Sequence, residues 1–286
     1  MKIFKVIRAF LKLRKIKLKK DEICLICPAG IGDTYFTCSL INEIKKKYKT
    51  NISVLIKKEH LAIAMAFKKD IKSIFFFDSE SIKFTKLFSL KFSPSKFFYS
   101  HPGMLFFPRK LRILGYKINL LDLYKLLFNL DKDSELTKPN FKKINIANKN
   151  KRQVFLAPES STANEISADL WFNLYKLFNE LGYEVLINSN KAKFNFNKKA
   201  KFYNLEELPA ILENCKYFIS SRSGICDWIA ETKVNKIIIY NNHVWYDGTI
   251  FDGSSFNMMG FGKNISEIIF KNKSLTIKKI KEVINK

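Results

Sequence analysis

Short apolar runs alternate with helix-like periods along most of this chain of 286 residues, and this alternation limits the folds that the chain can adopt. In the first half, the predicted strands are 22–27, 51–57, 72–77 and 95–100, and the predicted helices are 34–48, 60–69 and 119–130. In the second half, the predicted strands are 153–158, 183–189, 216–220 and 235–240, and the predicted helices are 168–181, 205–215 and 224–232. Such an alternation is typical of parallel sheets joined by crossover helices, so the sequence predicts an α/β fold.

A polar stretch without lasting periodicity separates the two series of strands and helices. It covers 136–151, contains a proline and is predicted to be a linker. We therefore expect an N-terminal segment over 1–20, two Rossmann-like, doubly wound domains over 21–135 and 152–264, and a helical tail over 265–286. One larger domain is the alternative. Two sheets of this kind that face each other form a cleft at the carboxyl ends of their strands, where ligands bind.

The chain is strongly basic, with 51 Lys and Arg against 26 Asp and Glu and a formal net charge of +25. Only six of the basic residues are Arg, whereas proteins that read nucleic acids rely on Arg for bidentate contacts. The excess of Lys therefore indicates a general bias of composition, and we expect no nucleic-acid partner. The hydrophobic content of 47% excludes a disordered chain.

The first 20 residues hold nine basic residues and no acidic one. Apolar residues lie between the basic ones, at the spacing of one face of a helix. A basic amphipathic helix of this kind binds the interface of an anionic membrane. The alternatives are a solvated arm and a helix that packs on its own domain. No apolar run is long enough to cross a membrane, so we expect a cytoplasmic protein that is peripheral on the inner face of the plasma membrane.

Five cysteines are an odd number for a disulfide framework and fit free thiols in a reducing compartment. Cys24 and Cys27 form a CxxC pair, but this pair lies in a predicted strand and has no second CxxC to complete a zinc site. We therefore expect no bound metal.

The loop PAGIGDTYF, over 28–36, follows the first predicted strand. Gly30 and Gly32 allow a tight turn, and Asp33 falls at or next to the start of the following helix. The loop matches neither the dinucleotide-binding fingerprint nor the P-loop. Asp33 is therefore either a helix cap or a general base that acts on a sugar hydroxyl in the cleft.

Two loops of the second half also connect a strand to a helix. In the later one, Ser221, Arg222, Ser223 and Gly224 could bind phosphate, because free N–H groups and the positive end of a helix dipole favour an anion, and the Arg222 fork could clasp a diphosphate. An ordinary turn with Arg222 on the surface is the alternative. In the earlier loop, hydroxyl groups are candidates for sugar or phosphate binding, although loop solubility explains them equally well. These candidates are Ser160 and Ser161.

Two histidines are further candidates. His101 follows a predicted strand and could contact the acceptor from the cleft, although a loop histidine without a function is an equal alternative. His60 opens a predicted helix and is expected on the surface.

Together, these loops resemble those of the heptosyltransferase-like glycosyltransferases, family 9, which have the GT-B fold. The shared order is a GD pair in the first loop, a proline followed by small residues and a later Trp in the second half, and an SG-containing loop that opens a late helix. The resemblance implies that Asp33 is the general base, that the late loop binds the diphosphate of a nucleotide sugar, and that no metal or other cofactor is needed. This chain has Arg222 where the family has Asp, Asp227 where it has His, and no counterpart of the family's Lys before the Trp helix. We expect Arg222 to replace that Lys, with Asp227 also at the donor site.

The expected function is therefore transfer of a sugar from a nucleotide-sugar donor to a cell-surface glycan or its lipid-linked precursor. A non-catalytic protein that binds nucleotide sugars, or that acts as a scaffold in glycan assembly, is the alternative.

Overall fold

The computed structural model describes residues 2–78, 85, 96–105, 118–144, 152–160, 164–245 and 248–285. The chain divides into two compact units. The first consists of Met1–Pro108 and Leu120–Asn140, and the second of Arg109–Asn119 and Phe141–Lys286. The main division after Asn140 falls within the linker that the sequence predicts.

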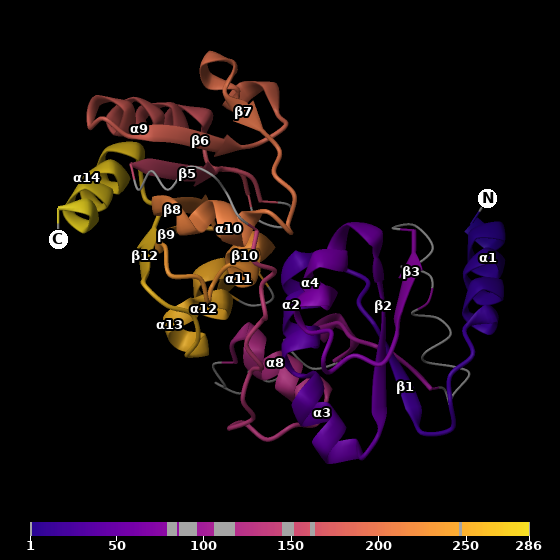
Figure 1. Cartoon of the computed structure of the whole chain (residues 1–286). Helices are drawn as coiled ribbons and strands as arrows, with labels where there is room; N and C mark the ends of the chain where they lie inside the picture. The colour runs from indigo at the N-terminus through magenta and orange to yellow at the C-terminus, as the bar shows by residue number, and fades with distance from the viewer. Residues whose placement is uncertain are drawn as a thin grey trace. The chain divides into compact units, whose positions relative to one another are not determined.

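The first unit is a parallel sheet with helices on both faces (Figure 1). In chain order, its elements are α1 Lys2–Lys15, β1 Glu22–Ile26, α2 Ile31–Ser39, α3 Ile41–Tyr48, β2 Asn51–Lys57, the 3₁₀ turn η1 Lys58–His60, α4 Leu61–Ala66, β3 Ile74–Phe77, β4 Phe97–Tyr99, the 3₁₀ turn η2 Pro102–Met104 and α8 Leu120–Leu127. The strand order is β3-β2-β1-β4, and each neighbouring pair is parallel. The order reverses between β1 and β4, which is where open α/β sheets bind ligands.

The helix predicted over 34–48 forms as two helices, α2 and α3, which meet at Leu40. Helix α2 begins at Ile31, three residues earlier than expected, because Gly30 is its N-cap and the Asp33 carboxylate accepts the Gly30 backbone N–H.

Helix α1 is part of the first unit's core. Leu13 is buried against Cys24, Ile26 and Leu55 of the sheet, on the face opposite α2 and α4 (Figure 1). The side of α1 that carries Leu13 therefore packs on its own domain, which is one of the alternatives for the N-terminal segment.

The second unit contains a larger parallel sheet. In chain order, its elements are β5 Gln153–Ala157, α9 Ala168–Glu180, β6 Glu184–Asn188, the 3₁₀ turns η3 Ala192–Phe194 and η4 Phe196–Lys198, β7 Ala200–Lys201, α10 Leu208–Glu213, β8 Cys215–Ser221, α11 Gly224–Trp228, β9 Asn235–Tyr240, β10 Val244–Trp245, β11 Gly248–Thr249, α12 Ile250–Ser254, α13 Phe256–Met259, β12 Ile265–Ile269 and α14 Lys273–Ile284. Strands β10 and β11 form a small antiparallel hairpin outside this sheet.

The six strands of this sheet follow the order β7-β6-β5-β8-β9-β12, which is the doubly wound order 3-2-1-4-5-6. Apolar side chains of α9 and α14 cover one face, where Trp171, Phe178 and Ile280 are fully buried. Helices α10 and α11 lie on the other face (Figure 1). The strand order reverses between β5 and β8, so the loops after these two strands flank the expected ligand position.

The expectation of a helical tail is wrong over Ile265–Ile269, which form β12 and pair in parallel with β9. This run contains Ser266 and Glu267, so it lacks the unbroken apolar pattern of the central strands. As an edge strand it pairs on one side only, and of its residues only Ile268 is buried. The helical prediction holds for α14.

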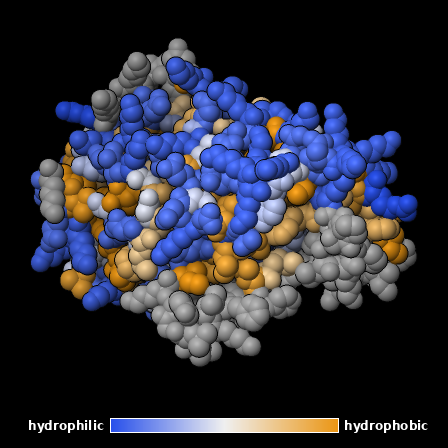
Figure 2. All heavy atoms as spheres, turned by 90° about the horizontal axis from the view of Figure 1, so that it is seen from below, coloured by the Kyte–Doolittle hydropathy of each residue, from blue (hydrophilic) through white to orange (hydrophobic). Residues whose placement is uncertain are grey.

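The described helices include none that combines the length and the apolar character needed to cross a membrane. On the face that Figure 2 shows, hydrophilic residues cover much of the surface, and smaller hydrophobic areas lie between them.

Candidate active site

Asp33 lies in the first turn of α2, at the point where the strand order of the first unit reverses. Its Oδ2 accepts the backbone N–H of Gly30 at 2.9 Å, and its Oδ1 accepts the hydroxyl of Tyr124 at 2.5 Å. The side chain of Asp33 is still 23% exposed. Asp33 therefore caps its helix, which is one of the two roles that the sequence predicts for it. It also presents a fixed carboxylate to solvent.

His101 comes from the loop after β4 and reaches the same carboxylate. Its Nδ1 accepts the Gly103 N–H at 3.0 Å, so the neutral ring carries its proton on Nε2, which lies 3.7 Å from Asp33 Oδ1. A Cβ at position 103 would lie 2.8 Å from His101 Nδ1, so glycine is needed there for this ring position. The structure thus brings together Asp33, His101 and Gly30, with Gly32 buried in the first turn of α2.

Tyr124 is a residue of this site that the sequence analysis did not identify. It lies on α8, is fully buried, and stacks on Phe36 with the ring centroids 5.4 Å apart. In the sequence it is one aromatic residue on an amphipathic helix, 91 positions from Asp33, so nothing in its local pattern indicates a polar partner.

His60 is buried, contrary to the expectation of a surface position. Its Nδ1 lies 2.8 Å from Thr34 Oγ1, which in turn donates to the Gly30 carbonyl at 3.2 Å. Because the Thr34 hydroxyl has one proton to donate, His60 Nδ1 is the donor in this chain. Burial and the positive charge of Lys57 lower the pKa of His60 to about 4, so the ring is neutral behind the turn that carries Asp33.

In the second unit, the carboxyl ends of β5 and β8 are bonded to each other by side chains as well as by the ladder. The Ser221 hydroxyl donates to the Pro158 carbonyl at 2.9 Å, and the Ser220 hydroxyl lies 3.0 Å from the Ala157 carbonyl and 2.7 Å from the Ser221 carbonyl. Ser223 and Gly224 follow at the tip of the β8 loop and are half-buried. The Ser221 hydroxyl therefore ties the end of β8 to the start of the loop after β5, at the point where the strand order reverses.

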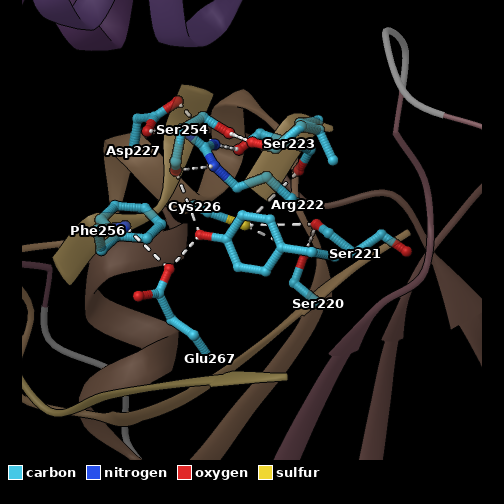
Figure 3. Close-up of polar contacts among 11 residues, drawn as sticks. Ser220, Ser221, Arg222, Ser223, Cys226, Asp227, Ser254, Phe256 and Glu267 are labelled. Carbon is cyan, nitrogen blue, oxygen red and sulfur yellow. Dashed lines mark hydrogen bonds and ion pairs between the residues drawn. The ribbon is translucent and has the colours of Figure 1, made fainter. Parts of the chain in front are cut away.

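Arg222, in the loop after β8, and Asp227, on α11, bond to each other (Figure 3). The guanidinium makes a bidentate ion pair with the carboxylate, with N–O distances of 2.6 and 3.0 Å, and both side chains are buried. Burial alone would lower the pKa of Arg222, but the Asp227 carboxylate outweighs this effect and holds the pKa above its usual value. The alternative of a surface Arg222 is therefore wrong, and the guanidinium faces protein groups rather than solvent.

The loop after β5 is tied to the loop after β6. Glu159 accepts the Ser189 hydroxyl and, at 3.2 Å, the Asn190 N–H. Ser160 is half-buried beside Glu159, whereas Ser161 lies outside the described residues.

The five cysteines are all buried and free. Burial raises the pKa of Cys27 to about 12, which keeps this thiol protonated. In the part of the chain that the structure describes, no three His, Cys, Asp or Glu side chains are arranged to hold a metal ion.

No protein-family model and no curated protein matches the sequence. Solved structures do match the fold. Escherichia coli heptosyltransferase WaaC with ADP matches with a TM-score of 0.55 and 11% identity, covering 92% of this chain and 99% of that chain. This chain has the fold of the heptosyltransferases.

Two further structures support this heptosyltransferase-like fold. Escherichia coli ADP-heptose lipopolysaccharide heptosyltransferase II matches with a TM-score of 0.58 and 11% identity, over 92% of this chain and 97% of that chain. A family 9 glycosyltransferase from Veillonella parvula matches with a TM-score of 0.54 and 13% identity, over 95% of this chain and 91% of that chain. The resemblance inferred from three short loops is therefore confirmed for the fold of both units.

Proposed function

We propose that this protein is a glycosyltransferase of the GT-B type, which transfers a sugar from a nucleotide-sugar donor to an acceptor hydroxyl. The observation that carries the proposal is the setting of Asp33. Its carboxylate is partly exposed and is held by two hydrogen bonds. It follows the carboxyl end of β1, where open α/β sheets bind ligands, in a fold shared with glycosyltransferases.

In the proposed reaction, Asp33 accepts the proton of the acceptor hydroxyl as that oxygen bonds to the anomeric carbon of the donor sugar. The bond between the anomeric carbon and the diphosphate breaks, and the nucleoside diphosphate leaves with the bonding electrons. His101, with Nε2–H near Asp33, is placed to contact the acceptor. No resident metal or cofactor takes part in this proposal; the nucleotide sugar is the co-substrate.

The donor is proposed to bind the second unit, at the loops after β5 and β8. Ser160, Ser221, Ser223 and Gly224 contribute hydroxyl and backbone N–H groups there, and Ser161 is included from the sequence alone. The structures of WaaC with ADP and with ADP-2-deoxy-2-fluoro heptose support a nucleotide sugar as the ligand of this fold. We propose that the two units face each other across a cleft, as GT-B domains do.

The acceptor is proposed to be a cell-surface glycan, of the lipopolysaccharide, lipooligosaccharide or capsule type, or its lipid-linked precursor. Helix α1 supports a place at the inner face of the plasma membrane, because Ile7 and Leu11 are exposed beside Arg14 and Lys15 on the side away from the sheet. An Ile7→Ser/Leu11→Ser variant should lose binding to vesicles that contain anionic lipid. Unchanged binding would remove the membrane proposal.

The activity is tested with Asp33→Asn. Removal of the base should lower turnover by about 10²- to 10⁴-fold and leave the affinity for nucleoside diphosphates unchanged. Turnover is measured as release of ADP, GDP or UDP from the corresponding nucleotide sugars in the presence of glycolipid acceptors. Asp133→Asn, at an exposed position of the same unit, is the matched control. Full activity of Asp33→Asn would refute the assignment of the base.

The alternative is a non-catalytic protein that binds nucleotide sugars or acts as a scaffold in glycan assembly. It is favoured by the two departures from the family pattern, because Arg222 and Asp227 bond to each other at the proposed donor loop. Nucleoside diphosphate binding without turnover of any donor would support this alternative.

A further inference from the structure

Arg222, in the loop after β8, and Asp227, on α11, are two positions at which this chain departs from the family that it resembles. We infer that they form a brace, a buried ion pair that sets the conformation of the loop, and that neither side chain contacts the donor. This role differs from the phosphate clasp that the sequence suggests for Arg222. The inference rests on the proposed function only for the identity of the ligand.

Protein acceptors already occupy most of the Arg222 guanidinium. Its Nε donates to the Ser254 carbonyl at 3.1 Å, one terminal nitrogen donates both to the Ser223 carbonyl at 2.7 Å and to Asp227, and the other donates to Asp227. Four of its five N–H groups therefore have protein partners. A diphosphate could be clasped by two N–H groups of this guanidinium only if a bond to a protein acceptor broke, and a broken ion pair would deprive the buried Asp227 carboxylate of its bidentate partner.

The brace links the loop to three elements. Within the loop it holds the Ser223 carbonyl, and through Asp227 it holds α11. On its other side, the guanidinium bonds to Ser254 of α12 and lies 4.9 Å from the ring centre of Phe256 on α13 (Figure 3).

The far side of the brace is itself held by a polar network. Glu267 of β12 accepts the backbone N–H of Phe256 at 2.9 Å and the hydroxyl of Tyr240 at 2.5 Å. The Tyr240 hydroxyl gives its one proton to Glu267, and its oxygen lies 3.2 Å from the Ser254 carbonyl that accepts the Arg222 Nε–H. Burial raises the pKa of Tyr240, so its hydroxyl stays protonated in this network.

The brace leaves the tip of the loop open for a ligand. The backbone N–H groups of Gly224 and Ile225 donate to no backbone acceptor outside their own helix among the described residues. The pair has no net charge, so it supplies geometry to these N–H groups and no cation to a phosphate. Arg222 and Asp227 therefore represent one coupled change from the family pattern, in which two residues of opposite charge, five positions apart, pair with each other.

Two conservative variants separate a brace from a phosphate ligand. Arg222→Lys keeps the positive charge but loses the fork that matches Asp227. Asp227→Asn keeps the shape of the partner but frees the Arg222 charge. If Arg222 bound the diphosphate, the first variant would retain most of the affinity and the second would bind more tightly. The exposed ion pair Lys142–Glu206 of the same unit supplies the control Glu206→Gln.

The experiment measures two quantities on the full chain. Hydrogen exchange of peptides that cover 220–228 reports the loop without any ligand, and titration with ADP, GDP and UDP reports the proposed site. We expect both variants to speed exchange in the loop and to weaken nucleoside diphosphate binding by about tenfold or more, with Glu206→Gln unchanged. If either variant is unfolded, the double variant Arg222→Met/Asp227→Leu removes both charges and should restore the fold and part of the affinity.

Three results would overturn the inference. They are unchanged loop exchange in both variants, tighter diphosphate binding by Asp227→Asn, and nearly full affinity of Arg222→Lys. If the unaltered protein binds none of the three nucleotides, the proposed function fails, and the exchange measurement still decides whether the pair is a brace.

Discussion

Asp33 and Arg222 both lie in loops that connect a strand to a helix, and both are charged, but their partners give them different roles. Asp33 receives one backbone and one tyrosine hydrogen bond and remains partly exposed, so it can still accept a proton from a ligand. Arg222 meets a carboxylate and two carbonyls inside the protein, so its charge is used internally. Residue type alone does not distinguish these two situations.

Tyr124 is predicted to position Asp33. The change Tyr124→Phe keeps the buried ring and removes only the hydroxyl that donates to Asp33 Oδ1 at 2.5 Å. We expect turnover to fall by about 10- to 10²-fold, as one hydrogen bond to a charged group is worth about 1.5–3 kcal/mol, with the donor KM unchanged. Steady-state kinetics measure this split between kcat and KM. Tyr48→Phe, which removes a hydroxyl that donates to the Phe128 carbonyl of the same unit and not to Asp33, is the control. A changed donor KM with unchanged kcat would contradict the prediction.

His60 is predicted to make the first unit sensitive to acid. Its pKa is about 4 in the folded protein, whereas an unfolded His titrates near about 6.5. Protonation therefore favours the unfolded chain between these values, and the free energy of unfolding should fall by about 3 kcal/mol as the pH drops from 6.5 to 4. Urea unfolding at several pH values measures this loss. A His60→Gln variant should show a flatter profile, and a profile as steep as that of the unaltered protein would contradict the prediction.

Helix α1 has a buried side and an exposed side, so the same substitution should affect the free energy of unfolding differently on the two sides. Leu13 is buried against the sheet, so Leu13→Ala should lower the free energy of unfolding by about 2–4 kcal/mol. Leu11 is 51% exposed on the same helix, so Leu11→Ala should change it by less than about 0.5 kcal/mol. Chemical denaturation of the two variants tests the packing of α1. Equal effects would show that this helix does not dock on the sheet in solution.

At the scale of the whole molecule, both units follow one plan. Each is a parallel sheet whose candidate residues lie at the point where the strand order reverses, Asp33 and His101 in the first unit and the loop Ser221–Gly224 in the second. The plan requires every strand of each sheet, including the edge strand β12, which lies in the region predicted as a helical tail.

Truncation after Asn264 is therefore predicted to unfold the second unit. The shortened chain lacks β12 and α14, which bury Ile268 and Ile280, and lacks Glu267, which accepts the backbone N–H groups of α13. Near-ultraviolet circular dichroism and hydrogen exchange should show loss of tertiary structure in the second unit. A chain that ends at Ile284 is the control and should stay folded. A folded truncated unit would show that the last strand and helix are dispensable.

By itself, the sequence determined the α/β class, the positions of the central strands, the resemblance to the heptosyltransferases and the candidate Asp33. These features depend on local patterns, namely apolar runs of strand length, helical periods and short loops between them. Only the tertiary structure decided that Tyr124 lies against Asp33, that His60 is buried, that Arg222 pairs with Asp227 and that Ile265–Ile269 form a strand. Each of these depends on which distant segments pack together. Packing sets the burial, the partner and so the charge state of a side chain, and none of these is encoded in its neighbours along the chain.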